Sequence, residues 1–161
     1  MSAPGRPTAE TGRNQETVLA DELNRMIALA EEARSEETWA FDSLSRFVHG
    51  CADARLDPLA SAVAGDAAEI EAARARLLKA LDGIVRAGHD ESALREDVGT
   101  GDVVGAVGLL VRGLSTVPAG LGEELSERAA RLVLAGMRAH PAPVPPGAPL
   151  TAEELVQRVS A

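Results

Sequence analysis

The side chains of this 161-residue chain best suited to nucleophilic or metal chemistry are its three histidines and its single cysteine. His49 and Cys51 stand two positions apart. On a helix this spacing turns them to different faces, so they cannot pair as imidazole and thiolate. His89 and His140 have no further ligand-type side chain at metal-binding spacing. We therefore predict no metal site, and we expect Cys51 to pack as a small apolar residue.

Carboxylates offer a second route to catalysis, and adjacent glutamates occur at 31–32, 36–37 and 123–124. Catalytic carboxylates need apolar surroundings that raise one pKa, whereas sequence neighbours on a helix diverge toward its solvated faces. No nucleophile, base and orienting residue can be assembled from the sequence. The stretch from Gly99 to Gly105 resembles a dinucleotide-binding loop, but that loop requires a preceding strand. We predict no catalytic residues and no cofactor.

Charge and composition restrict the partners. The formal net charge of −9 repels phosphate, which predicts that the chain binds no nucleic acid directly. It offers no polybasic attraction to a membrane, and it has no run of about eighteen apolar residues that would form a transmembrane helix. The first residues lack the apolar stretch of a signal peptide, and one cysteine allows no internal disulfide. We expect a cytoplasmic protein.

Apolar residues recur at three- and four-residue steps along most of the chain, which predicts helices. The expected helices span residues 14–33, 35 to about 51, 58–65, 66–87, 102–114, 121–139 and 152–159. Their expected N-caps are Ser35, Asp57, Asp66, Thr100 and Thr151, and Gly88 is the expected stop of the fourth helix. No segment alternates with period two. The fold class is therefore all-α, an antiparallel bundle of about six helices plus a short C-terminal helix.

We expect one domain, with a short segment outside its helical core at each end. Residues 1–13 contain prolines and glycines without periodicity, and we expect a loose lead-in. Residues 14–139 form the helical core. Residues 140–161 begin with a proline-rich stretch that must leave the helical state, and this stretch should act as an extended strap that carries the terminal helix.

The helices expected over 102–114 and 121–139 look like a dimer surface. Val and Leu lie on more than one face, and both helices contain glycines, each of which costs roughly 1 kcal/mol relative to alanine. Close approach of another backbone would explain why these helices keep glycines despite that cost. We predict a homodimer through a four-helix bundle, with the interface residues Val104, Val107, Gly108, Val111, Leu125, Leu132 and Gly136. On this prediction, Val107→Glu or Gly108→Arg would give monomers or aggregates.

Three segments together resemble the TetR family of bacterial regulators. They read ALREDV at 93–98, TGDVV at 100–104 and LVLAGMR at 132–138. In that family a leu-arg-x-asp-val step precedes the first of two dimerisation helices. Residues 16–33 resemble the helix that joins the family's DNA-binding unit to its regulatory core, and LSRFVH at 44–49 fits the following helix. The resemblance covers roughly residues 16–139, and it implies effector binding and dimerisation.

The departure from the family lies at the N-terminal end. The family opens with three helices that place a recognition helix in the major groove of DNA. Here GRNQETVLA at 12–20 resembles the family's usual opening and leads straight into the regulatory core. We therefore expect a regulatory core without its own DNA-binding unit, and the sequence reads the same for a natural and an engineered deletion.

The resemblance also implies where a small apolar ligand would bind, because the family's effector lies inside the core bundle. Mapped onto this chain, the site falls between the first, second and fourth helices. Two of the three aromatic residues of the chain, Trp39 and Phe47, also fall there. The predicted ligand-binding residues are Met26, Trp39, Leu44, Phe47, Cys51, Leu77 and Leu81. His49 is the nearest polar anchor. The alternative is that these side chains fill one another's space as an ordinary core.

Three functions remain open from the sequence. The first is a dimerising, effector-binding regulatory module. The second is an interaction protein that pairs with a full-length relative through the same two helices and antagonises it. The third is a cofactor-free enzyme that uses a bundle cavity for an apolar substrate. The first two differ in whether a cavity exists, and the third needs a polar catalytic group inside it.

Overall fold

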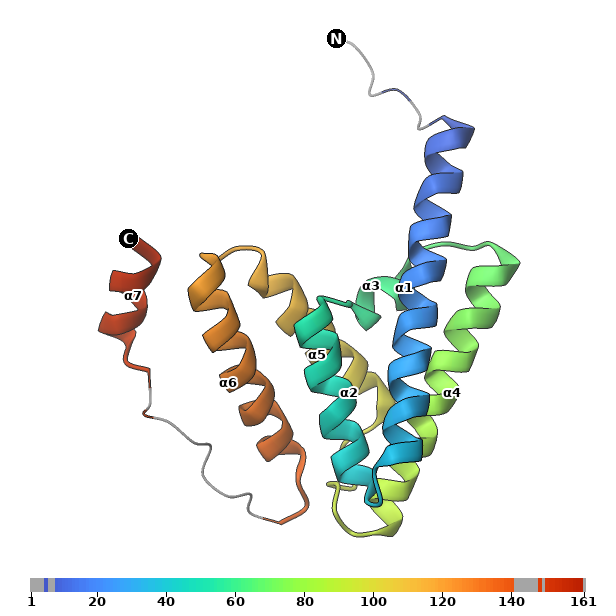
Figure 1. Ribbon diagram of the computed structural model, residues 1–161. Helices are drawn as coiled ribbons and strands as arrows, with labels where there is room; N and C mark the ends of the chain where they lie inside the picture. The colour runs from blue at the N-terminus through green and yellow to red at the C-terminus, as the bar shows by residue number, and fades with distance from the viewer. Residues whose placement is uncertain (1–4, 6–7, 141–147, 149, 161) are drawn as a thin grey trace.

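The computed structural model describes residues 5, 8–140, 148 and 150–160. Within these residues the chain is helical and contains no strand, which confirms the all-α class (Figure 1). The helices are α1 (Ala9–Glu36), α2 (Ala40–Ala54), α3 (Pro58–Val63), α4 (Ala68–Asp90), α5 (Thr100–Leu114), α6 (Ala119–Met137) and α7 (Ala152–Ser160).

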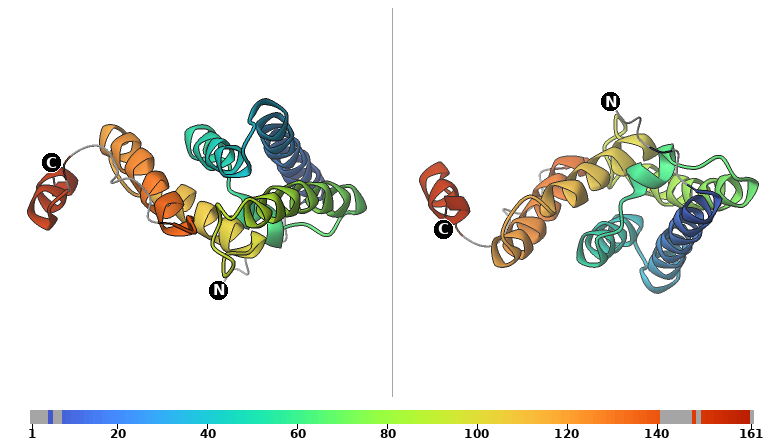
Figure 2. Two further views of the ribbon diagram at one scale, coloured as in Figure 1. Left: turned by 90° about the horizontal axis from the view of Figure 1, so that it is seen from below. Right: turned by 90° about the horizontal axis from the view of Figure 1, so that it is seen from above.

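The helices form two neighbouring groups. Figure 2 shows α1, α2 and α4 gathered at one end of the molecule, with α5 and α6 extending from them in a row. The N-terminal half of α1 projects beyond the bundle, and α7 stands apart beyond α6 (Figure 1). One apolar core runs through both groups and includes Phe47 of α2, Leu81 of α4 and Val107 of α5. The two groups therefore belong to a single domain.

The first helix begins earlier than the sequence indicated. Thr8 is its N-cap, and the Thr8 hydroxyl accepts the backbone N–H of Thr11 at 3.3 Å. The expected lead-in over residues 1–13 is therefore wrong from Ala9 onward. The buried residues of α1 begin only at Leu23, so the projecting N-terminal turns are helical although none of their residues is buried in the core. Local capping and helix propensity, which periodicity does not register, extend the helix there.

Ser35 is not the cap of α2. It lies in the last turn of α1 and donates its hydroxyl to the carbonyl of Glu32 at 2.9 Å. The N-cap of α2 is Trp39, whose side chain makes no capping bond. Instead the carboxylate of Glu91, after the end of α4, accepts the backbone N–H of Ala40 at 2.9 Å. A tertiary contact thus supplies the capping hydrogen bond that Ser35 was expected to make.

Two other caps were also wrong. Asp66 does not cap α4, which begins after Ala67 without a side-chain capping bond. At α5 the N-cap is Gly99 and not Thr100, and the carboxylate of Asp102 accepts the Gly99 N–H at 2.8 Å. That contact satisfies a backbone donor from inside the first turn.

Two caps are confirmed at the short helices. The Asp57 carboxylate accepts the N–H of Ala60 at 2.9 Å, and a proline follows at the first position of α3. Thr151 and Glu154 form a reciprocal capping box at α7, with both bonds at 3.2 Å. The proline-rich strap ahead of α7 lies almost entirely outside the described residues.

Gly88 does not end α4. It is buried inside the helix, which continues to Asp90, and an added Cβ at Gly88 would lie 3.1 Å from the Cβ of Leu94. The turn after the helix instead contains Ser92 in the left-handed region, with φ 55°. Close packing of the following loop, rather than helix termination, therefore explains the glycine.

The sixth helix is displaced by two residues from the range expected, and it ends at Met137. Arg138 then pairs with Leu94 in an isolated antiparallel bridge, and the N–H of Ala139 donates to the carbonyl of Ala93 at 3.0 Å. None of the helices described here is both long enough and apolar enough to span a bilayer.

Candidate functional site

Six of the predicted ligand-binding residues lie together in the core. They share exposures of 2% or less and belong to one apolar cluster: Met26, Leu44, Phe47, Cys51, Leu77 and Leu81. Trp39 is not among them, because it stands at the start of α2 with 62% of its surface exposed. Its assignment to an enclosed pocket is therefore wrong. Trp39 is exposed because it is the N-cap of α2 and lies outside the buried face of that helix.

The Cys51 thiol is unsuited to nucleophilic chemistry. It is completely buried, and this burial raises its pKa to about 12. The thiol is therefore protonated at neutral pH, and the thiolate is the reactive form. The structure accordingly places no activated cysteine in the core, as the apolar-packing prediction for Cys51 implies.

The residues predicted for the dimer interface divide into two sets. Val104, Val107, Gly108 and Val111 of α5 are buried inside the protomer. At Gly108 an added Cβ would overlap the Cβ of Leu59, so the glycine serves the contact between α5 and α3. These four residues are not available to a second copy. Val107→Glu and Gly108→Arg would disrupt the protomer itself, which corrects the expected readout of both substitutions.

The outer faces of α5 and α6 carry a different set of apolar residues. Leu109 is 66% exposed on α5, and Leu132 is 52% exposed on α6. Gly105, Gly113 and Gly136 face open space, since an added Cβ at each would meet no atom within 4 Å. We call these five residues the outer face. Of the residues predicted, Leu132 and Gly136 belong to it, and Leu125 is half-buried on the same helix.

The motif at 93–98 fixes the C-terminal end of α6. The backbone N–H of Arg95 donates to the carbonyl of Met137 at 2.9 Å, and its guanidinium reaches the carbonyl of Gly136 at 3.3 Å. Asp97 holds that guanidinium through two bonds of 2.7 and 2.9 Å. The hydrogen bond from Arg95 lowers the pKa of Asp97. In this chain the motif therefore anchors one of the two helices that bear the outer face.

His89 braces the same loop from the end of α4. Its Nε2 lies 3.1 Å from the carbonyl of Arg95 and 2.9 Å from that of Val98. With Glu91 capping α2, the connection between α4 and α5 contacts the ends of two other helices. His89 thus has a structural role there, because a nitrogen facing two carbonyl oxygens acts as their donor.

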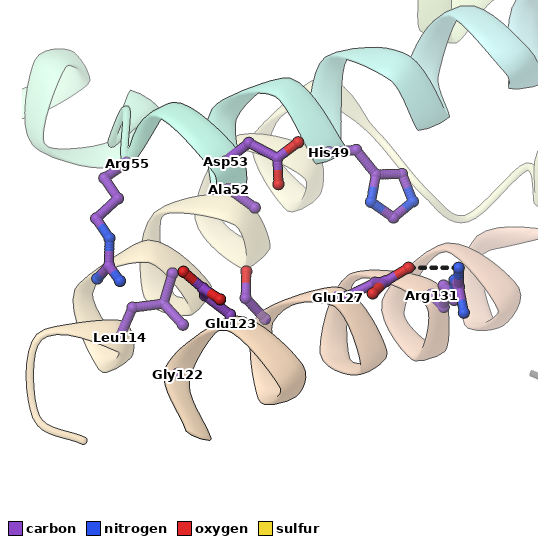
Figure 3. Close-up of a pocket in the computed structure, with 10 residues that line it drawn as sticks. His49, Ala52, Asp53, Arg55, Leu114, Gly122, Glu123, Glu127 and Arg131 are labelled. Carbon is purple, nitrogen blue, oxygen red and sulfur yellow. Dashed lines mark hydrogen bonds and ion pairs between the residues drawn. The ribbon is translucent and has the colours of Figure 1, made fainter. Parts of the chain in front are cut away.

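A pocket of about 670 Å³ lies elsewhere, between α2 and α6 (Figure 3). His49 and Asp53 line it from α2, opposite Glu123, Glu127 and Arg131 of α6. Glu127 and Arg131 form an ion pair at 2.5 Å. His49, which was expected to anchor a ligand in the core, faces this polar groove instead.

The apolar part of this pocket is formed by Ala52, Leu114 and Gly122, and Arg55 and Ser126 complete the lining. Sequence reasoning missed the site, although a signal is present. Residues 49 and 53 repeat at a spacing of four, as do 123, 127 and 131, which places each set along one helix face. Nothing in that spacing indicates that the two faces meet.

No family model matches the chain, and no curated protein matches it either. The arguments about function therefore depend on the residues themselves and on their arrangement.

Proposed function

We propose that this chain is a dimerising regulatory module of the TetR type, which pairs through the outer faces of α5 and α6. The observation that carries the proposal is the exposure of Leu109 and Leu132 on neighbouring helices. Large apolar side chains grouped on a surface favour association with a partner that covers them.

The glycines of the outer face support the same proposal. Gly105, Gly113 and Gly136 leave open space on the surfaces of α5 and α6. Small residues allow a facing helix to approach closely, and Gly105, in the interior of α5, costs roughly 1 kcal/mol relative to alanine when nothing compensates. A two-fold interface of two helices from each copy would use this space, and stable interfaces of this kind bury upwards of about 1,200 Å².

The burial of the core favours pairing, rather than effector sensing, as the primary activity. Phe47, Cys51 and Leu81 are fully buried in the core cluster. A small apolar effector between α1, α2 and α4 would have to part these side chains. The second candidate, an antagonist that pairs with a full-length relative, uses the outer face equally well. Cysteine-based catalysis lacks a reactive group, because the pKa of Cys51 is raised to about 12.

Sedimentation velocity of matched variants tests the proposal. The double variant Leu109→Glu/Leu132→Glu places two charges on the outer face and should sediment as a monomer, with the wild-type circular dichroism spectrum. Val63→Glu is the matched control, because Val63 is 74% exposed at the end of α3 and is not one of the outer-face residues. It should leave the dimer intact. A double variant that remains dimeric would refute the proposed interface.

A further inference from the structure

One buried serine differs from the others. Ser43, Ser61 and Ser126 are the buried polar residues among the described positions. The hydroxyl of Ser43 donates to the carbonyl of Ala33 at 3.1 Å, and that of Ser61 donates to the carbonyl of Asp57 at 3.1 Å. Within the described chain the Ser126 hydroxyl has no such partner, although only 7% of the residue is exposed. Buried hydroxyls normally find a hydrogen-bond partner.

The Ser126 hydroxyl opens into the pocket between α2 and α6. Ser126 lines that pocket, and no fully enclosed side-chain nitrogen or oxygen in the described residues lacks a partner. The small exposed part of Ser126 therefore includes its Oγ. A hydroxyl that lines a pocket and has no partner among the described residues is available to bind a molecule that enters.

The charges around this hydroxyl are partly unpaired. Glu127 and Arg131 satisfy each other. Asp53, Glu123 and Arg55 form no ion pair with any described residue. Figure 3 shows Asp53 on the α2 wall, with Arg55 and Glu123 toward one end of the pocket. Two carboxylates and one guanidinium are thus free to bind complementary groups of a single ligand.

We propose that this pocket binds a small zwitterion of the dipeptide class. The ligand's ammonium group lies between Asp53 and Glu123, its carboxylate meets the guanidinium of Arg55, and Ser126 contacts the peptide group between them. An apolar side chain of the ligand packs against Leu114. The volume of about 670 Å³ falls within the range of roughly 300–1,000 Å³ that small-molecule sites occupy.

The charge arrangement distinguishes a zwitterion from singly charged ligands. An anion would meet Arg55 but would also face the carboxylates of Asp53 and Glu123, on a protein of net charge −9. A simple cation would satisfy the carboxylates and leave Arg55 without a partner. The proposed site is independent of the dimer, because the pocket lies between α2 and α6 whereas the five outer-face residues do not line it.

The test uses leucyl-leucine as the probe, with two analogues that each lack one charge. Leucyl-leucine amide lacks the carboxylate, and N-acetyl-leucyl-leucine lacks the ammonium group. Titration followed by ¹H–¹⁵N NMR should show saturable shifts at the amides of Asp53, Arg55 and Ser126. Each analogue should bind at least about tenfold more weakly than the parent dipeptide, because each loses one charge-assisted contact.

Variants locate the binding in the pocket. Asp53→Asn and Ser126→Ala should each weaken leucyl-leucine binding, the former by about tenfold, corresponding to one lost charge contact. Asp42→Asn is the matched control, because Asp42 is exposed on the same helix and does not line the pocket. This variant should bind leucyl-leucine like the wild type. The proposal is overturned if the dipeptide shows no saturable shifts, if either analogue binds equally well, or if Asp53→Asn leaves the affinity unchanged.

Discussion

The group of α1, α2 and α4 and the pair of α5 and α6 differ in where their apolar side chains lie. In α4 the buried stripe contains Ile70, Leu77 and Leu81, and the opposite face carries charged residues. In α5 Val103 and Val107 enter the core, yet Leu109 is 66% exposed on the other side. The fourth helix covers its apolar stripe within the protomer, whereas α5 leaves part of its apolar surface uncovered.

This difference separates residues that maintain the fold from residues that are free to bind. A helix with one apolar stripe has a single role in packing, and its sequence pattern identifies the core directly. A helix that is apolar on both faces serves two contacts. For α5 one contact is with α2, α3, α4 and α6 of the same copy, and the other is the proposed contact with a second copy.

The largest expected effect separates the two faces of α5. Val107→Glu should destabilise the protomer by about 4 kcal/mol or more, because it buries an unpaired charge in the core. Leu109→Glu should retain the folded protomer, since Leu109 is exposed. Urea unfolding followed by circular dichroism measures both. Equal losses of stability for the two variants would contradict the assignment of inner and outer faces.

The core around Cys51 should give stability a dependence on alkaline pH. Its pKa is raised from 9.0 to about 12 in the folded protein. The folded state therefore holds the thiol proton more tightly, and the resulting stability is present below pH 9 and is lost as pH rises toward 12. Between about pH 8 and 10 the free energy of unfolding should fall by about 1 kcal/mol through this group.

Cys51→Ala provides the control for that titration. The chain has no tyrosine, so few other groups titrate in this range. The variant should lose the alkaline decline, even though it begins from a lower stability because a buried atom is removed. An identical decline in the wild type and in Cys51→Ala would show that Cys51 is not the titrating group.

A smaller effect is expected at the start of α2. Glu91→Ala removes the carboxylate that accepts the Ala40 N–H, and the free energy of unfolding should fall by about 1 kcal/mol, as for the loss of an N-cap. Glu96→Ala is the matched control, because Glu96 is an exposed glutamate of the same loop. Thermal unfolding of the two variants should differ, and matching curves would argue against the tertiary cap.

The smallest effect is expected at α7. Its residues are not buried, and its described side-chain contact with the rest of the chain is the ion pair between Arg158 and the exposed Glu124. Exposed ion pairs contribute little to stability. Truncation after Ala139 should therefore leave the melting temperature unchanged within error. A large fall would show that α7 docks on the bundle.

The sequence predicted those features that depend on local spacing. The stripe of α4 repeats every three or four residues, and Asp57 and Thr151 cap helices through contacts with residues three positions away. A tertiary contact explains the missed cap of α2. Glu91 caps α2 from a position 51 residues distant, which no local pattern encodes.

The functional surfaces were harder to predict for a related reason. Because α5 is apolar on both sides, periodicity could not decide which valines face the core, and Val104 and Val107 were assigned to the wrong surface. The pocket between α2 and α6 requires two helices to meet across about seventy residues of sequence, as Asp53 and Glu123 do. Composition showed neither arrangement, and the helical periodicity did not reveal that Leu132 and Gly136 are exposed on α6.

The most direct test of the central claim is the mass of the wild-type protein in solution. The proposed outer-face interface predicts a homodimer, so sedimentation equilibrium at micromolar concentrations should give twice the chain mass of 16.7 kDa. Dilution should dissociate that species reversibly into single chains. A mass of 16.7 kDa across the whole accessible concentration range would contradict the proposed self-association of α5 and α6.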